Sequence, residues 1–190
     1  NCPSIDTPCL KCEHGLSVYV DCGGVSFLCD MGLTWGYREN ASLMGIDLQS
    51  VGFAVVSHGH NDHTGGLEDF LHSYANVPVY LSGDVMAHRY YSTRHGAKRD
   101  ISTQQSLVTD FNSRLLTINE SRWVSENIAI VKCESRCFET PRGNHFLMKD
   151  DARDDFSHEL SIAIKTAEGL VIISSCSHCG AMNIIESCRQ

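Results

Sequence analysis

Six consecutive positions, from His58 to His63, hold three histidines and one aspartate. The segment reads Ser57-His58-Gly59-His60-Asn61-Asp62-His63-Thr64-Gly65-Gly66. Imidazole and carboxylate groups are ligands for zinc, manganese and iron. Because glycine and asparagine separate these side chains, they can surround more than one ion. The segment therefore predicts a centre with one or two divalent metal ions, with zinc as the first candidate.

An apolar run, Phe53-Ala54-Val55-Val56, stands directly before this cluster. It is short, β-branched and followed by a turn signal, so it predicts a buried strand whose end carries the polar residues. After the cluster, Leu67, Phe70, Leu71 and Tyr74 recur with a helical period. The alternative is a polar surface loop with incidental histidines, which requires the strand, the cluster and the Gly-Gly helix start to coincide.

Other segments predict an alternation of strands and helices around this motif. We expect strands at 16–21 and 25–29 in a hairpin, a helix at 67–74, a strand at 78–81, a helix at 83–91, an exposed mobile connection at 92–112, strands of a second sheet at 115–118 and 128–131, a hairpin of 160–165 with 170–174, and a helix at 181–188.

Length and charge limit the classes of protein. The 190 residues, 42% of them hydrophobic, predict one domain, 1–190, with a sizeable core. The net charge of −8 argues against a nucleic-acid binder and against anionic membranes. No apolar run of membrane-spanning length occurs. The basic stretch at 89–99 predicts a solvated face, with a contact to a substrate phosphate as the alternative. We expect a cytoplasmic protein.

Ten cysteines are present, and two pairs have C-x-x-C spacing. These pairs are Cys9 with Cys12 and Cys176 with Cys179, and a structural zinc site built from both is one interpretation. Cys22 and Cys29 lie in apolar runs and are expected to be inert core thiols. The simplest interpretation of the high count is a reduced cytoplasmic setting, and a disulfide framework is the alternative.

The His-x-His-x-Asp-His pattern with its Thr64-Gly65-Gly66-Leu67 continuation resembles the metallo-β-lactamase superfamily. The resemblance implies an α/β protein with the αββα sandwich, in which two mixed β-sheets carry helices outside. It also implies a hydrolase that uses metal-activated water on an ester or phosphoester.

A narrower resemblance rests on segments spread over nearly the whole chain. Four segments are similar to one branch of metal-dependent hydrolases. They are Glu13-His14-Gly15-Leu16-Ser17, Phe27-Leu28-Cys29-Asp30-Met31-Gly32, Asp154-Asp155-Phe156-Ser157-His158-Glu159-Leu160 and Cys176-Ser177-His178-Cys179-Gly180. That branch is named for 7,8-dihydropterin-6-methyl-4-(β-D-ribofuranosyl)-aminobenzene-5′-phosphate synthase. It implies a small-molecule substrate, phosphorylated or pterin-like.

The superfamily resemblance also implies roles for the motif residues. His58 and His60 would hold the first ion, and Asp62 and His63 would hold the second. Asp62 would also orient the nucleophile or carry a proton, which makes it the candidate catalytic residue. Asp30 would orient the ligands from the end of the strand beside the site; a turn or helix-cap role is its alternative.

Later residues complete the implied site. His178 is expected to be a ligand, and Cys176 stands where most members have a bridging aspartate. A thiolate can bridge zinc ions, so Cys176 is either a ligand or uninvolved. Asp155 and His158 are candidates for direct contact or for a supporting role, and His14 is a candidate for the substrate pocket.

The end of the chain departs from the resembled pattern, and this departure affects the function that we expect. The branch carries one more strand with a final ligand histidine after the last helix expected here, so we expect a chain truncated at its C-terminus. With that ligand missing, a non-catalytic metal- or ligand-binding module is the alternative function. True β-lactamase activity is not expected, because a shared fold does not carry substrate.

Overall fold

The structure, a computed structural model, describes residues 9–189. They form two compact units. The first unit contains 9–56, 60–80 and 103–116, and the second contains 57–59, 81–102 and 117–189. The histidine motif is thereby divided, because His58 belongs to the second unit whereas His60, Asp62 and His63 belong to the first. The single domain expected from chain length stays a prediction.

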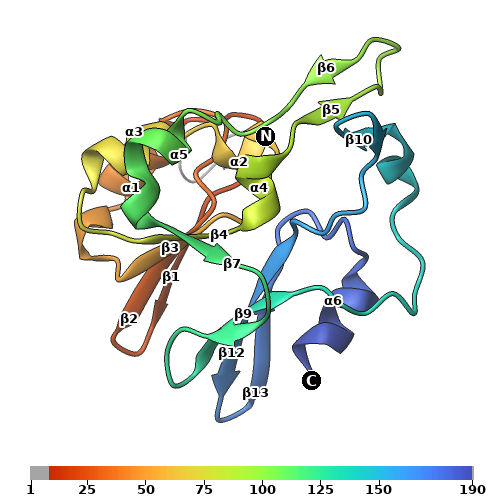
Figure 1. Ribbon diagram of the computed structural model, residues 1–190. Coiled ribbons are helices and arrows are strands. Elements are labelled where there is room, and N and C mark those ends of the chain that lie inside the picture. Colours follow the sequence, from red (N-terminus) through yellow and green to blue (C-terminus); the bar gives the residue numbers. More distant parts are fainter. Residues whose placement is uncertain (1–8, 190) are drawn as a thin grey trace. The chain divides into compact units, whose positions relative to one another are not determined.

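The first unit is built on a mixed sheet of order β1-β2-β3-β4-β7 (Figure 1). The hairpin β1 (Val18–Cys22) and β2 (Val25–Cys29) is antiparallel, as predicted, while β3 (Phe53–Val55) runs parallel to β2 and to β4 (Val79–Ser82). The rings of Phe27 and Phe53 stack at 5.0 Å between neighbouring strands. The parallel strand β3 is fully buried, which explains its unbroken apolar sequence.

One strand was assigned to the wrong sheet. The sequence placed β7 (Leu115–Ile118) in a second sheet, but it belongs to the first. Its apolar ends, Leu115 and Ile118, predict a strand. Nothing in a four-residue pattern specifies which edge the strand will join, so the error concerns pairing and not local structure.

Helices of the first unit follow the sheet strands. They are α1 (Gly36–Leu43), the 3₁₀ helix η1 (Leu48–Ser50), α2 (Asn61–Thr64), α3 (Leu67–Ser73), α5 (Leu107–Phe111) and the 3₁₀ helix η2 (Asn112–Arg114). The helix predicted at 67–74 is confirmed, with Leu67, Phe70 and Leu71 buried. Arg114 donates to the carbonyl oxygens of Tyr74 at 2.6 Å and Val77 at 2.8 Å, which satisfies acceptors near the end of α3.

The second unit contains an antiparallel sheet of order β13-β12-β9-β8. Its strands are β8 (Arg122–Trp123), β9 (Ile128–Lys132), β12 (Leu160–Thr166) and β13 (Gly169–Ile173). The predicted hairpin of 160–165 with 170–174 and the helix α6 (Ala181–Cys188) are confirmed. Strand β12 is central and buried over its first five residues, and it leads directly out of the segment that carries His158.

A third sheet, of order β11-β10-β5-β6, was not predicted. It joins β5 (Tyr90–Ser92), β6 (Arg99–Asp100), β10 (Leu147–Lys149) and β11 (Ala152–Arg153), with α4 (Gly83–Ala87) before it and the 3₁₀ helix η3 (Arg142–Phe146) leading into β10. The helix predicted at 83–91 is therefore wrong beyond Ala87, because Tyr90 is buried in a strand and its hydroxyl donates to the Asp84 carbonyl at 2.7 Å.

The connection predicted at 92–112 also contains more structure than its polar sequence suggested. It holds β6 and α5, and Thr103 and Leu107 are buried. Its basic residues pair with carboxylates at the surface, as Arg89 does with Asp100 at 2.6 Å and Lys98 with Asp151 at 3.0 Å. These pairs favour the solvated-face interpretation of the basic stretch.

Among residues 9–189, no helix combines the length and the apolar character needed to cross a membrane.

Candidate metal centre

Three side chains of the second unit bring their donor atoms together. His58, Cys176 and His178 each offer one atom, and these atoms lie within 4.8 Å of one another. His58 is buried, His178 is half-buried and the Cys176 thiol is exposed. Two imidazoles and a thiolate are a common ligand set for zinc. The donor chemistry of these residues therefore suits a zinc ion with one side open to solvent.

His58 is held by the residue that precedes it. The Oγ of Ser57 lies 2.8 Å from Nδ1 of His58, and the Ser57 carbonyl accepts the N–H of Leu160 at 2.7 Å. With the proton on Nδ1 and donated to the serine, the lone pair is on Nε2, which is the arrangement found at many histidine ligands of metals. The start of β12 thus anchors the backbone from which His58 projects.

His178 is held on its edge and on its face. Asn144 Oδ1 lies 3.1 Å from Nδ1 of His178, and Asn144 Nδ2 donates to the His178 carbonyl at 2.7 Å. The Phe156 ring stacks on the imidazole at 4.7 Å with an interplanar angle of 8°. Asn144 accepting the Nδ1 proton places the lone pair on Nε2. The Asn144 contact therefore favours the tautomer of His178 that suits ligation, and the Ser57 contact is compatible with the same tautomer in His58.

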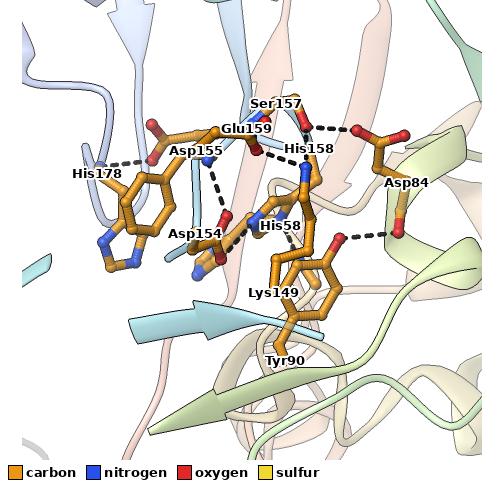
Figure 2. A network of polar contacts seen from close by, with 12 residues as sticks. His58, Asp84, Tyr90, Lys149, Asp154, Asp155, Ser157, His158, Glu159 and His178 are labelled. Atoms are coloured by element: carbon orange, nitrogen blue, oxygen red, sulfur yellow. Dashed lines mark hydrogen bonds and ion pairs between the residues drawn. The ribbon is translucent and has the colours of Figure 1, made fainter. Parts of the chain in front are cut away.

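A buried carboxylate shapes the turn that carries His178 (Figure 2). Glu159 is 2% exposed, and its two oxygens accept the backbone N–H groups of His178 at 2.7 Å and Cys179 at 2.6 Å. The turn has positive φ at Ser177 (55°) and Gly180 (90°), so consecutive N–H groups converge on one acceptor. Glu159 therefore determines where the His178 backbone lies.

Replacing Glu159 with alanine is expected to lower the free energy of unfolding by about 3 kcal/mol, since it leaves the buried N–H of Cys179 and the part-buried N–H of His178 without their acceptor. Zinc affinity should fall by roughly 10–100-fold, because the turn no longer orients His178. Urea denaturation and a zinc titration measure the two effects. Glu168→Ala, at an exposed turn position, is the matched control. Equal zinc affinity in Glu159→Ala and the control would contradict the positioning role.

His158 is engaged at both ring nitrogens within its own unit. Its Nδ1 accepts the N–H of Gly59 at 2.9 Å, and its Nε2 lies 3.1 Å from Oδ2 of Asp154. Both side chains, His158 and Asp154, are 0% exposed. Acceptance at Nδ1 puts the ring proton on Nε2, where Asp154 accepts it. This geometry favours a supporting role, in which His158 orients the backbone between two motif histidines; direct metal contact by His158 stays a prediction.

The Asp155 carboxylate pairs with a lysine. Its Oδ1 pairs with Lys149 Nζ at 2.5 Å, and the same ammonium donates to Ser157 Oγ at 2.8 Å (Figure 2). Ser157 Oγ in turn donates to Oδ2 of Asp84 at 2.5 Å. The lysine and the hydroxyl lower the pKa of Asp155, against the effect of its partial burial, which is the largest single influence. These contacts also favour a supporting role for Asp155.

In the first unit, the Asp-His part of the motif is joined to Asp30. Oδ2 of Asp30 lies 2.8 Å from Nδ1 of His63, and both side chains are buried. Oδ2 of Asp62 lies 3.5 Å from Nε2 of His63 and 3.3 Å from Nε2 of His14, whose side chain is 82% exposed. Asp30 thus orients His63 as a carboxylate orients a metal-binding histidine. Asp62 lies between a buried imidazole and one open to water.

The residues of the segment 13–17 contact the histidine motif and the Asp30 turn, and these contacts account for the residue types found there. The Leu16 N–H donates to the Asp62 carbonyl at 3.4 Å, and Ser17 Oγ donates to the Asp30 carbonyl at 2.8 Å. Gly15 has φ of 124°, and a Cβ there would come within 1.9 Å of the Asp62 carbonyl oxygen, so only glycine is tolerated. Glu13 accepts the N–H groups of Leu33 and Thr34 at 3.0 and 3.1 Å.

The structure thus brings His58, Cys176 and His178 together in one unit, and Asp30, Asp62, His63 and His14 in the other. His60 is buried in the first unit, and its pairing with His58 at one ion stays a prediction. Ser57, Asn144 and Glu159 were missed. Each acts through a specific hydrogen bond, which has no period or spacing for a sequence pattern to detect. Glu159 and Ser57 only adjoin recognised motif residues.

The cysteines fall into separate settings. Cys9 and Cys12 belong to the first unit, and Cys176 and Cys179 to the second, so a shared zinc site stays a prediction. Cys29 is a buried core thiol whose pKa is raised by burial and by the neighbouring Asp30, which agrees with an inert role; Cys22 is only half-buried.

Two relatives match most of the length of the chain. Two proteins of Methanocaldococcus jannaschii are each 24% identical to it over 92% of its length. One is the uncharacterized protein MJ0448, of which the match covers 66%. The other is named 7,8-dihydropterin-6-methyl-4-(beta-D-ribofuranosyl)-aminobenzene-5′-phosphate synthase, of which it covers 64%.

A solved structure shows the same fold. The crystal structure of Tm1679, described as a metal-dependent hydrolase of the beta-lactamase superfamily, matches 92% of this chain and 63% of its own with a TM-score of 0.73 and 28% identity. The chain thus spans slightly less than two thirds of the length of these three relatives. The sequence model of the family described as the metallo-beta-lactamase superfamily matches residues 10–163. The α/β fold expected from the sequence is confirmed, and the chain belongs to the metallo-β-lactamase superfamily.

Proposed function

We propose that this chain is a metal-dependent hydrolase that cleaves a carboxylic ester or a phosphoester, with zinc as the first candidate metal. The observation that carries the proposal is the convergence of His58, Cys176 and His178 within 4.8 Å. The Ser57 and Asn144 contacts to the two Nδ1 atoms support it, because they prepare both rings for ligation. A second ion would be held by Asp62 and His63, whose carboxylate oxygen and ring nitrogen lie 3.5 Å apart.

A divalent ion in such a site lowers the pKa of a water ligand toward neutrality and polarises a carbonyl or phosphoryl oxygen. The residues of the chain supply the proton handling. The Asp62 carboxylate is the candidate acceptor for a proton, and His14 Nε2 is 3.3 Å from it and largely in solvent. This pair offers a route by which a proton taken up by Asp62 is released to bulk water.

The candidate substrate class comes from the name of a relative. A small phosphorylated or pterin-like substrate is suggested by the name of one M. jannaschii relative. The net charge of −8 does not favour attraction of such an anion to the surface, and Arg89 and Lys98 are paired with carboxylates. Recognition of a phosphate would therefore depend on the metal itself more than on surface charge.

The test is turnover of a panel of phosphomonoesters, phosphodiesters and carboxylic esters by the zinc-loaded protein. Hydrolysis of at least one member is expected, with loss of activity on chelation and recovery when zinc is restored, because the reactive water depends on the ion. Tight zinc binding with no hydrolysis across the panel would contradict the proposal and favour a binding module. Hydrolysis that survives chelation would contradict the metal-dependent mechanism.

A further inference from the structure

The first unit contains a cavity of about 500 Å³. It is lined mainly by residues of the segment 10–19, of β2, of α1 and of η1. Within residues 9–189, none of the side chains that we propose as metal ligands is among the lining residues. Small-molecule sites in proteins have volumes of about 300–1,000 Å³, so the cavity has the size of a ligand site.

Apolar side chains form both the buried part and the open part of the cavity wall. Leu28, Ala41 and Leu48 are buried. Leu16 and Met44, which also line the cavity, are 39% and 61% exposed. Covering apolar surface that is in contact with water is favourable, and exposed apolar surface in a concave region is a mark of binding sites. The wall therefore favours an apolar ligand without help from a charged group.

The charged and amide side chains of the wall are engaged with other parts of the protein. Asn40 accepts the backbone N–H of Lys11 at 2.8 Å and donates to the Lys11 carbonyl at 3.0 Å. The Lys11 ammonium pairs with Glu39 and lies 4.3 Å from the centre of the Trp35 ring. The Glu13 carboxylate accepts two backbone N–H groups, at 3.0 and 3.1 Å. A charged ligand would therefore compete with contacts that the protein already makes.

Two hydroxyl groups of the wall are engaged in the same way. Ser17 Oγ donates to the Asp30 carbonyl at 2.8 Å, and Tyr37 Oη donates to Oδ2 of Asp69 at 3.0 Å. A polar or charged group that enters an apolar site without a partner loses the free energy of its hydration. The wall thus selects for a ligand that has no charge and few polar atoms.

We propose that this cavity binds a free, uncharged small molecule with a hydrocarbon chain, held by apolar contact. A concave site of this volume suits such a molecule better than a protein partner, whose interface would cover about 800 Å² on each side. The net charge of −8 also disfavours an anionic amphiphile. The proposal does not rest on the proposed hydrolase function, because the lining side chains are not the proposed metal ligands.

The test is binding of the neutral fluorescent probe N-phenyl-1-naphthylamine to the intact chain, followed by displacement of the probe. Its fluorescence should rise on binding, because its surroundings become apolar. 1-Decanol should displace the probe at a concentration about tenfold lower than decanoate or decylammonium does, because the charged groups of the wall are already paired. 1-Decanol should also raise the midpoint of thermal unfolding, since it binds the folded chain.

Met44→Lys and Leu43→Lys form a matched pair of variants. Both residues are exposed at the end of α1, but of the two only Met44 lines the cavity. Met44→Lys should weaken probe binding by about tenfold, because it removes an apolar contact and adds a charge at the opening. Leu43→Lys should bind the probe as the wild type does. Ala41→Leu, which fills part of the cavity without adding a charge, should also weaken binding.

The two lysine variants keep the test decisive even where Ala41→Leu does not fold, since both change exposed positions. A wild type that does not bind the probe, displacement by a charged homologue at a lower concentration than 1-decanol, or an equal loss of binding in both lysine variants would each overturn the proposal. Sedimentation velocity adds one further outcome. A dimer that dissociates in Met44→Lys would assign the apolar wall to a second copy of the chain and would likewise overturn the proposal.

Discussion

Replacing His178 with alanine is expected to weaken zinc binding at the second unit by at least about a hundredfold, since losing a group that only orients a ligand already costs roughly 10–100-fold. The change removes one of three converging donors and leaves His58 and Cys176. Hydrolysis should disappear with the metal. A competition titration against a chromophoric chelator gives the affinity, and turnover of the active panel member gives the second readout.

The matched control for this variant is His95→Ala, an exposed histidine of the same unit outside the donor group. It should bind zinc and turn over substrate as the wild type does. Circular dichroism should show that both variants fold, because His178 is held in a turn and not in the sheet core. Equal zinc affinity in His178→Ala and His95→Ala would mean that His178 is a half-buried histidine with a structural role.

Replacing Asp62 with alanine is expected to lower turnover by roughly a thousandfold, the range of a lost general acid or base. The variant removes the carboxylate that lies 3.3 Å from His14 and 3.5 Å from His63. His60→Ala should be equally inactive if His60 is a ligand. Turnover at saturating zinc separates the proton role from metal affinity, because excess metal can restore occupancy but not the missing carboxylate.

Asp110→Ala provides the comparison, since it removes an exposed carboxylate from α5 in the same unit. It should retain full activity. Asp62→Ala should retain the wild-type circular dichroism spectrum, because only the main-chain carbonyl of Asp62 supports the Leu16 N–H. Unchanged turnover in Asp62→Ala would refute its catalytic assignment while leaving the metal proposal intact.

Local structure was largely predictable because the decisive residues are close in sequence. The Leu67 helix has a helical period, and the Phe53 strand is a short, β-branched apolar run bounded by a turn signal. The last hairpin and α6 are likewise indicated by residues close in sequence. The histidine motif likewise indicates metal binding from residue types within six positions. These features need no knowledge of distant contacts.

Long-range pairing was not predictable in the same way. The third sheet depends on the pairing of β5 with β10, in which the partners Tyr91 and Met148 are more than forty positions apart, and its other strands, β6 and β11, have only two residues each. Strands this short carry no period, and β7 was assigned to the wrong sheet for a related reason. Tertiary contacts determine whether such short strands form and which strands they pair with, so sequence patterns do not predict them.

The supporting residues of the site were missed because each makes a specific hydrogen bond across the fold. Asn144 and His178 are 34 positions apart, and Glu159 and Cys179 are 20 apart. Asparagine and glutamate are common at surfaces, so neither type signals a contact with a metal ligand. The burial of Glu159 and the contact of Asn144 with Nδ1 of His178 depend on the folded arrangement of distant segments.

The most direct measurement is the absorption spectrum of the protein with Co²⁺ added in place of Zn²⁺. Because a thiolate ligand gives cobalt an intense charge-transfer band that oxygen and nitrogen ligands lack, the wild type should show this band at about one equivalent of bound cobalt. Cys176→Ser should lose the band and keep weaker cobalt binding, while Cys22→Ser should keep both. A wild-type spectrum without the band, or an unchanged band in Cys176→Ser, would contradict the centre formed by His58, Cys176 and His178.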